Sequence, residues 1–245
     1  QTSLVGSEMC IRDRSNWNVS NVITMFGTFM NATNFTSDLS NWDVSSVTEM
    51  NSMFASASNF HGNISTWNVS NVTNMRNMFG SATSFNGDIS NWDVSNVIRM
   101  DWMFYNADSF NQDLSDWNVS SVLNMDGMFF RADLFSGNIS TWDVSNVTTM
   151  KEMFKEAASF NQDISNWNIS NVTDMADIFL EAISLSDRNS CSIHQTWSSN
   201  DNWPYDWSDL CFQPQTKEEL QTAVDLWTDD TVSYTHLTLP TILLV

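Results

Sequence analysis

Seven tryptophan residues recur at a fixed interval of twenty-five residues, and this spacing constrains the fold more than any other feature of the chain. They are Trp17, Trp42, Trp67, Trp92, Trp117, Trp142 and Trp167. Each begins a segment like WDVSNVTTMKEMFKEAASFNQDISN, residues 142–166, without insertion or deletion. A period of this length is typical of stacked repeats, in which each unit becomes stable only against its neighbours. We therefore predict a seven-repeat stack over residues 15–188.

Two periodicities follow one another inside each repeat. Trp142 and Val144 alternate with polar residues, as in a strand with one buried face. Apolar residues then fall at i, i+3, i+4 and i+7, the spacing of an amphipathic helix: Met150, Met153, Phe154 and Ala157. The predicted fold class is an α/β solenoid. It is a leucine-rich-repeat-like, right-handed stack of strand and short-helix units with a parallel sheet on one face.

Stacking would turn every apolar position of the repeat into a column running through the molecule. Twelve of the fourteen methionines lie in two such positions, and tryptophan and phenylalanine occupy three others. A methionine or aromatic column is more often core than cofactor site, because the unbranched thioether fills gaps between rings. We therefore assign these columns to the core. Trp102 and Tyr105 are the aromatic residues expected to be exposed on the helical side.

The repeat also resembles a known family. The motif W-[DN]-V-S-N-V-x-x-M-x-x-M-F-x-x-A-x-x-F-N-x-D-I-S is similar to that of the BspA-like leucine-rich repeat surface proteins, in a Trp- and Met-rich branch of unknown function. The likeness covers residues 17–191 and weakens in the last repeat, where Leu185 replaces phenylalanine and Arg188 replaces aspartate. The resemblance implies a cell-surface or extracellular location and a binding or adhesive role. It supplies no ligand and no catalytic residues.

Segments outside the repeats complete the domain plan. Residues 1–14 and 232–245 match neither the repeat nor each other, and we interpret both as non-native, adapter-like sequence. The Trp-rich segment 189–213 is predicted to cap the stack. Residues 214–231 are predicted to form a capped amphipathic helix or linker, because Thr216 and Glu219 have capping-box spacing. The resemblance further implies a monomeric module of a longer protein.

Two cysteines flank the predicted cap. Cys191 and Cys211 would close a loop of about twenty residues in an oxidising compartment, which stabilises a fold by about 3 kcal/mol in the chain-entropy model. Two buried free thiols are the alternative. Neither cysteine has metal-ligand spacing.

The charge balance excludes two classes of partner. Nine Lys and Arg against twenty-nine Asp and Glu give a formal net charge of −20, which repels nucleic acid and anionic lipid. No apolar run reaches the length of a membrane span, so we expect no membrane insertion by this chain. A protein or a glycan on another surface is the expected partner.

A polar column suggests where such a partner binds. The residue after each tryptophan alternates strictly between the amide and the acid: Asn18, Asp43, Asn68, Asp93, Asn118, Asp143 and Asn168. On a strand face these residues would form an exposed ladder, suited to sugar hydroxyls or a protein surface. Because the acids would occupy every second rung, alternation would also separate neighbouring carboxylates by about 10 Å. Solubility of the sheet, or duplication of a pair of repeats, explains the pattern equally well.

The alternative function is a structural spacer on a surface, stabilised by a divalent cation. Calcium prefers six to eight oxygen ligands, and the turns supply carboxylates at Asp38, Asp88, Asp113 and Asp163. No loop has the D-x-D-x-D-G pattern, so no cofactor is expected, with calcium as the only candidate. Enzymatic activity is not expected either. His61, His194 and His236 are far apart in sequence, and no catalytic or phosphate-loop motif is present.

Overall fold

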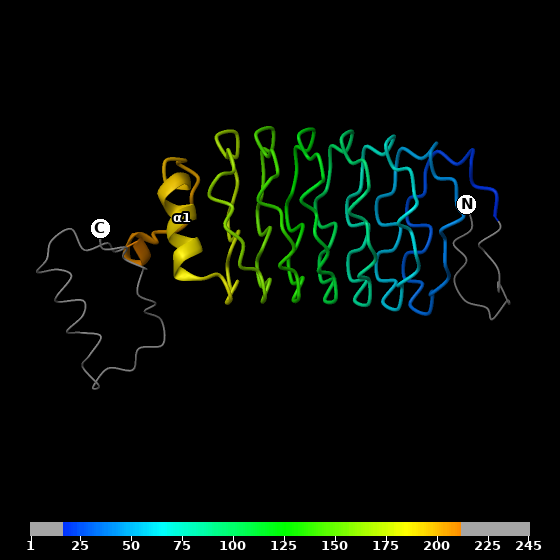
Figure 1. The fold of residues 1–245 in the computed structure, drawn as a ribbon, viewed down its shortest axis with the longest axis horizontal. Coiled ribbons are helices and arrows are strands. Elements are labelled where there is room, and N and C mark those ends of the chain that lie inside the picture. The colour runs from blue at the N-terminus through cyan, green and yellow to red at the C-terminus, as the bar shows by residue number, and fades with distance from the viewer. Residues whose placement is uncertain (1–16, 212–245) are drawn as a thin grey trace, which may run out of the picture.

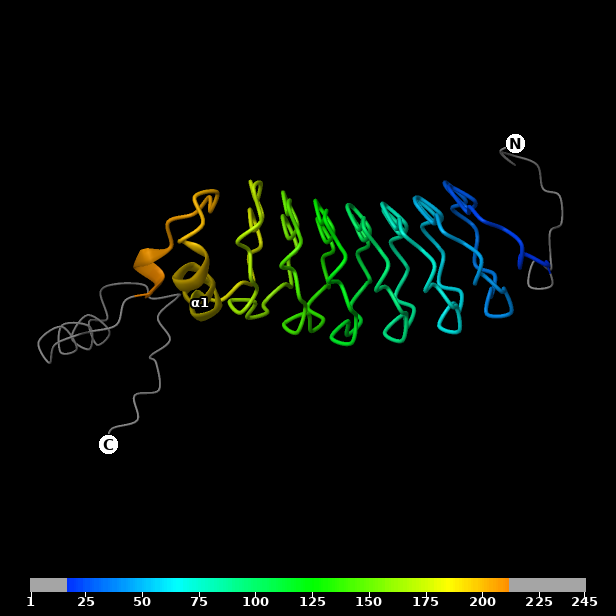
Figure 2. The same cartoon turned by 90° about the horizontal axis from the view of Figure 1, so that it is seen from above.

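The computed structural model describes residues 17–211, in which the seven repeats form seven coils lying in one row (Figure 1). Coils 1 to 7 are residues 17–41, 42–66, 67–91, 92–116, 117–141, 142–166 and 167–191. Helix α1 (Asp187–Trp197) begins at the end of coil 7, and the 3-10 helix η1 (Ser208–Cys211) follows it. The described part is a long, narrow stack, and its coils keep a similar outline in the view of Figure 2.

The predicted parallel sheet is wrong. Within residues 17–211, strand-type pairing between neighbouring coils is limited to isolated parallel bridges, with one bridging residue in each coil, and no strand forms. The bridging residues are Thr24, Glu49, Asn74, Arg99, Asn124, Thr149 and Asp174. A sheet needs consecutive extended residues in register on both chains. Here the chain turns within one or two residues of each bridge, so the ladder cannot extend.

The predicted helix of each repeat is also wrong, because the segment from the first methionine onward is a run of tight turns. The Met53 N–H donates to the Met50 carbonyl of its own coil at 3.1 Å, but the next N–H, of Phe54, donates to Met78 of the following coil at 2.9 Å. In each coil two residues four positions apart have φ between +52° and +62°. That left-handed conformation interrupts an α-helix. The helical spacing of apolar residues therefore reports successive turns rather than a helix.

The segment predicted as a strand is joined to its neighbours by side chains. Asn71 Nδ2 donates to the Ser45 carbonyl of the preceding coil at 2.7 Å, and Thr66 Oγ1 donates to the Ser40 carbonyl at 2.8 Å. Backbone groups close short turns instead, as where the Val47 N–H donates to Val44 at 2.9 Å. Side-chain amides and hydroxyls thus replace the ladder that a parallel sheet would have supplied on this face.

Shared columns of rings and thioethers fill the interior of the stack. Phe54 and Phe79 stack with ring centroids 5.6 Å apart, and Trp67 and Trp92 with centroids 6.2 Å apart. The two phenylalanines are completely buried, and both tryptophans are nearly so. From coil 3 onward, the indole N–H of the tryptophan that begins each coil also donates to a backbone carbonyl, as Trp67 does to Leu39 at 2.9 Å. These five tryptophans therefore bury apolar area with their N–H groups paired, whereas the buried indole N–H of Trp197, beyond the last coil, has no hydrogen-bond partner within the described residues.

An aromatic cap closes the C-terminal end of the described stack. Ser186 caps α1, whose Trp197 continues the tryptophan column by stacking on Trp167 at 6.2 Å. Further rings from Trp203 and Trp207 pack against Phe179 of coil 7. A disulfide joins Cys191 to Cys211, with their Cα atoms 4.9 Å apart. The predicted segments 1–14, 214–231 and 232–245 lie outside the described residues.

Candidate functional site

Coils differ from one another mainly on one outward-facing side. With each tryptophan as position 1, positions 1, 9 and 16 are tryptophan, methionine and alanine in all seven coils, whereas positions 10, 11 and 14 vary. Position 14 carries Ala55 and Gly80 in coils 2 and 3, between Met30 of coil 1 and Tyr105 of coil 4. Small side chains in two adjacent coils, with bulky ones on either side, produce a depression across the stack.

This depression, which we call the trough, is open to solvent and has a volume of about 600 Å³. Its floor consists of the side chains of Asn51, Ser52, Arg76 and Asn77. Phe26 forms one wall, and the aromatic cluster of Trp102, Tyr105 and Phe130 forms the other. No side chain of this lining is a carboxylate. The trough therefore combines aromatic walls with a polar, hydrogen-bonding floor.

Trp102 is held in the wall at a conformational cost. It has φ +62°, in a column where the neighbouring coils carry Asn77 at +53° and Gly127 at +56°. A bulky residue in the left-handed region is a genuine outlier and costs about 1–2 kcal/mol. The indole ring lies over Gly127, where an added Cβ would be 2.4 Å from Trp102 Cε3. Gly127 thus provides the space that Trp102 occupies.

The three rings of the wall contact one another and two cations. Trp102 meets Tyr105 edge-on at 5.6 Å and Phe130 at 6.0 Å, and Tyr105 lies 5.4 Å from Phe130. Arg131 and Lys155 each lie 5.4 Å from the Phe130 ring centroid, a cation–π distance. Hydrogen bonding to Glu156 raises the pKa of Arg131. The same effect from Glu152 raises the pKa of Lys155. Both cations are therefore already paired.

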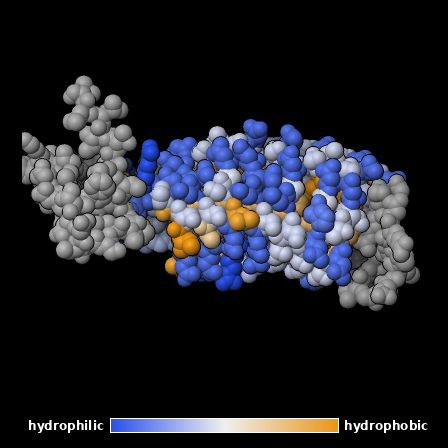
Figure 3. Space-filling model, turned by 60° about the horizontal axis from the view of Figure 1, so that its bottom comes forward, coloured by the Kyte–Doolittle hydropathy of each residue, from blue (hydrophilic) through white to orange (hydrophobic). Residues whose placement is uncertain are grey.

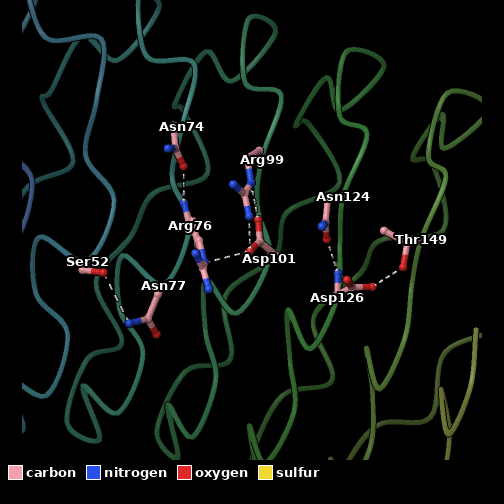
Figure 4. A network of polar contacts seen from close by, with 9 residues as sticks. All are labelled: Ser52, Asn74, Arg76, Asn77, Arg99, Asp101, Asn124, Asp126 and Thr149. Carbon is pink, nitrogen blue, oxygen red and sulfur yellow. Dashed lines mark hydrogen bonds and ion pairs between the residues drawn. The ribbon is translucent and has the colours of Figure 1, made fainter. Parts of the chain in front are cut away.

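A buried carboxylate positions the arginine of the floor. Asp101 is only 2% exposed, accepts hydrogen bonds from Arg99 Nε and Nη2 at 2.9 and 2.8 Å, and forms an ion pair with Arg76, whose Nε lies 3.0 Å away. Figure 4 shows Asp101 between the two guanidinium groups. The hydrogen bonds that Arg99 donates to Asp101 raise the pKa of Arg99. Arg76 also has its backbone N–H held by Asn74 Oδ1 at 3.0 Å. Two guanidinium groups therefore share one carboxylate at the trough, and the Arg76 side chain is 52% exposed.

The side chain of Asn77 occupies space that Gly80 of the same coil leaves free. A Cβ at Gly80 would lie 1.8 Å from Asn77 Oδ1. Asn77 Nδ2 donates to Ser52 Oγ of the preceding coil at 3.5 Å, a long hydrogen bond that Figure 4 also shows. Within the described residues, no hydrogen-bond partner holds the side-chain amide of Asn51. The floor therefore keeps polar groups that can bond a ligand.

The predicted ladder is separate from the trough, because none of its residues lines it. All seven residues Asn18, Asp43, Asn68, Asp93, Asn118, Asp143 and Asn168 are exposed. Their Oδ1 atoms accept the backbone N–H of the serine two residues later, as Asp43 does from Ser45 at 3.1 Å. Hydrogen bonds from the hydroxyl groups of the same serines, followed by these backbone hydrogen bonds, lower the pKa of Asp43, Asp93 and Asp143. The ladder thus has a structural role in closing turns, and a binding role for it stays a prediction.

The residues predicted as weak cation ligands occupy a second column of such turns. Asp38, Asp88, Asp113 and Asp163 each accept the backbone N–H of the serine two residues later, at 2.8 to 3.0 Å. Hydrogen bonds from Ser90 lower the pKa of Asp88. In the part of the chain from 17 to 211, no group of three or more His, Cys, Asp and Glu side chains could hold a metal ion. Calcium binding by these residues also stays a prediction.

A second hollow, of about 440 Å³, lies between coil 7 and residues 196–202. It includes Asn168 of the predicted ladder. The Asn200 amide at its edge donates to the Ile169 and Val172 carbonyls at 2.8 and 3.1 Å. Asn202 donates to the Val172 carbonyl at 3.4 Å. These amides attach the cap to the last coil, so we assign this hollow a structural role.

Exposed apolar side chains are few and unevenly distributed. On the face seen in Figure 3, polar side chains dominate, and apolar atoms gather toward the C-terminal half of the stack. At the trough, Phe26 is 61% exposed. The sequence predicted Trp102 and Tyr105 as exposed aromatics, whereas both are half-buried, and it did not indicate Phe26, Arg76 or Phe130. The available sequence signal for the trough was a bulky residue at a position where adjacent repeats carry a small one.

The fold defines the protein as a repeat protein, built from coils that are stable only against one another. The chain belongs to the family described as "Mycoplasma protein of unknown function, DUF285", whose model matches residues 5–117 and again residues 103–202. No curated protein matches the chain. In the described residues, no helix has the length and apolar character needed to cross a membrane.

Proposed function

We propose that this chain is a non-enzymatic binding module of a cell-surface or extracellular protein, and that it binds its partner at the trough. The observation that carries the proposal is Trp102. Every coil has a positive φ at this position, from Gly27 to Asp177, and only coil 4 bears the strain of a bulky, half-buried ring there. Strain of this kind persists where the surrounding structure fixes it, and it clusters at functional sites.

The uneven distribution of variation along the coils supports the same face. Buried positions repeat from coil to coil because each must fill the same space in a column. Turn-closing positions repeat because each must accept the same N–H group. Positions 10, 11 and 14 vary between coils, as positions 8, 15 and 17 also do, and there the coils present different side chains. A repeat stack that binds a specific partner needs such non-repeating residues on its surface.

The resemblance to the BspA-like surface proteins supports the location and the adhesive role that we propose. The matched family is of unknown function and therefore assigns no partner. The net charge of −20 argues against nucleic acid and anionic lipid as partners. A protein or a glycan on another surface is the partner class that these observations favour.

A cell-binding assay with matched variants tests the proposal. The intact chain is labelled and incubated with immobilised cells and extracellular matrix, alongside Trp102→Asn. A second variant combines Asp43→Asn, Asp93→Asn and Asp143→Asn, which keeps every turn-closing oxygen but removes the ladder charges. We expect the intact chain to be retained on a surface. Trp102→Asn should abolish this retention, and the ladder variant should leave it unchanged. Retention that depends on the ladder charges and not on Trp102 would move the site to the ladder.

A further inference from the structure

We propose that the trough binds a neutral oligosaccharide, with a sugar ring on the indole of Trp102 and its hydroxyl groups on the polar floor. This inference rests on the proposed binding function and adds the chemical class of the ligand. Three properties of the trough lead to it: its charge, its aromatic wall and the hydrogen-bonding groups of its floor.

The charge of the trough favours an uncharged ligand. Arg76 is the only charged residue of the lining, and the buried Asp101 holds its Nε at 3.0 Å. The nearby cations are paired as well, Arg131 with Glu156 at 2.6 Å and Lys155 with Glu152 at 3.0 Å. Arg76 shares the Asp101 carboxylate with Arg99, but the chain's net charge of −20 would repel a free anionic ligand. A cationic ligand would find no carboxylate in the lining.

The aromatic wall suits a ring with an apolar face. Phe130 packs on one side of Trp102 and Tyr105 meets it edge-on, so the indole is braced by its neighbours rather than free to rotate. A rigid aromatic surface offers large contact area at low entropic cost. Pyranose rings present C–H groups on one face, which pack against such a surface. A nucleobase would also stack, but the charge of the chain opposes nucleic acid.

The floor suits hydroxyl groups better than an apolar peptide side chain. Asn51 and Asn77 supply amide donors and acceptors, Ser52 supplies a hydroxyl, and Arg76 supplies further N–H donors. An apolar side chain buried on this floor would leave those groups unpaired, which is costly. Sugar hydroxyls both donate and accept, so they can satisfy amides and a guanidinium together. This combination of stacking and bidentate polar groups is what favours a glycan over a peptide.

An array of neutral and anionic glycans probed with the intact 245-residue chain tests the ligand class. Neutral glycans that are retained are then titrated in solution by saturation-transfer NMR and by tryptophan fluorescence. Three variants accompany the chain. Trp102→Asn removes the ring, and Asn77→Gly removes an amide at φ +53°, which glycine tolerates. Leu134→Ala removes an exposed apolar side chain of coil 5 outside the trough.

We expect neutral glycans to be retained and Trp102→Asn to weaken their binding by at least about tenfold, as for the loss of an aromatic anchor. Asn77→Gly should weaken it by about threefold or more, and Leu134→Ala should leave it unchanged. Preference for anionic glycans, or neutral binding indifferent to both trough variants, overturns the inference. An array without retained neutral glycans, combined with Trp102-dependent cell binding, overturns the glycan class while the proposed function stands.

Discussion

At the scale of single residues, the trough depends on two side chains that the backbone tolerates only because of their neighbours. Trp102 has φ +62° and needs Gly127 beneath its ring, and Asn77 needs Gly80 in the same way. Glycine serves in both places by having no Cβ, and at Gly127 it also suits the positive φ. The shape of the site is therefore set by small residues as much as by the aromatic ones.

Gly127→Ala tests the space under Trp102, with Gly27→Ala as its matched control. Both glycines occupy position 11 with φ +56° and +58°, but an added Cβ meets Trp102 at 2.4 Å in one case and Met30 at 3.7 Å in the other. We expect Gly27→Ala to lower the free energy of unfolding by about 1 kcal/mol, from backbone strain alone. Gly127→Ala should cost about 1–3 kcal/mol more, because the indole must move.

A double-mutant cycle by urea denaturation measures this difference. Combining Gly127→Ala with Trp102→Asn should remove the excess cost, because the clash disappears with the ring. An equal cost of Gly127→Ala in the presence and absence of the indole would show that Trp102 does not lie over Gly127.

Element-scale comparison shows which parts of the repeat could be predicted from sequence and which could not. The aromatic columns follow from the period, because identical rings at equal spacing stack when the coils do. The helix was wrongly predicted, because Met150, Met153 and Phe154 have helical spacing and yet lie on successive turns. Small residues at the left-handed positions, such as Ser52 and Ser56, were the available signal for turns. The strand was wrongly predicted because Trp-x-Val is too short an alternation to distinguish a strand from an extended segment between turns.

The candidate site was predictable only in part. Trp102 and Tyr105 could be recognised as surface aromatics, but which side of the coil they share with Arg76 depends on the turns. The ladder residues were correctly placed on the surface, yet their hydrogen bonds to serines could not be read from alternation between Asn and Asp. Either residue type provides the same Oδ1 acceptor, as Asn68 and Asp43 both show. The turn therefore accommodates both members of the alternating pattern.

The aspartate turns predict a pH dependence of stability. Hydrogen bonds from serines lower the pKa of Asp43, Asp88 and Asp93 below the ordinary value of 3.8. A lowered pKa in the folded state stabilises the fold above the ordinary pKa, and this stabilisation is lost as the pH falls through the folded pKa. Asp108 acts in the opposite direction, because burial and Asp133 raise its pKa. The pKa values of Asp143 and Asp206 are lowered in the same way, so we expect the lowered carboxylates to dominate and stability to fall below about pH 4.

Two triple serine variants separate this effect from loss of packing. Ser45→Ala, Ser90→Ala and Ser95→Ala remove the hydroxyls that donate to the three aspartates. The control variant carries Ser65→Ala, Ser70→Ala and Ser120→Ala, which remove hydroxyls that donate to asparagines. In denaturation followed from pH 7 to pH 3, the first variant should show a shallower pH dependence than the wild type. The control should be less stable at every pH with an unchanged dependence, and equal slopes for the two variants would contradict this explanation.

The disulfide makes a separate prediction for the cap. Cys191 and Cys211 are separated by 20 residues in sequence and hold α1 to η1. Replacing both with serine should lower the free energy of unfolding by about 3 kcal/mol in the chain-entropy model. Intact-mass analysis with and without reduction before alkylation establishes the bond, and an unchanged mass would show that the thiols are free. Equal stability of the chain and the double variant under non-reducing conditions would exclude a stabilising role.

At the scale of the whole molecule, the stack makes each coil depend on its neighbours. Backbone donors at positions 9, 11, 13 and 15 of one coil reach carbonyl groups of the next, and side chains span the opposite face. The trough exists only because coils 1 to 5 lie in this order, with small residues in coils 2 and 3. Fold and proposed function therefore depend on the same coil-to-coil bonds.

Hydrogen exchange measured residue by residue with NMR tests this arrangement most directly. In coil 4, the amides of Met100, Trp102, Phe104 and Asn106 donate to the next coil at 2.7 to 3.1 Å. We expect slow hydrogen exchange at these alternate amides. We also expect the amides of residues 92–95 to exchange faster than the strongly protected amides of a parallel ladder would. Strong protection across residues 92–95, together with continuous i to i−4 helical protection over 100–107, would contradict the stack of turns and restore a sheet and helix.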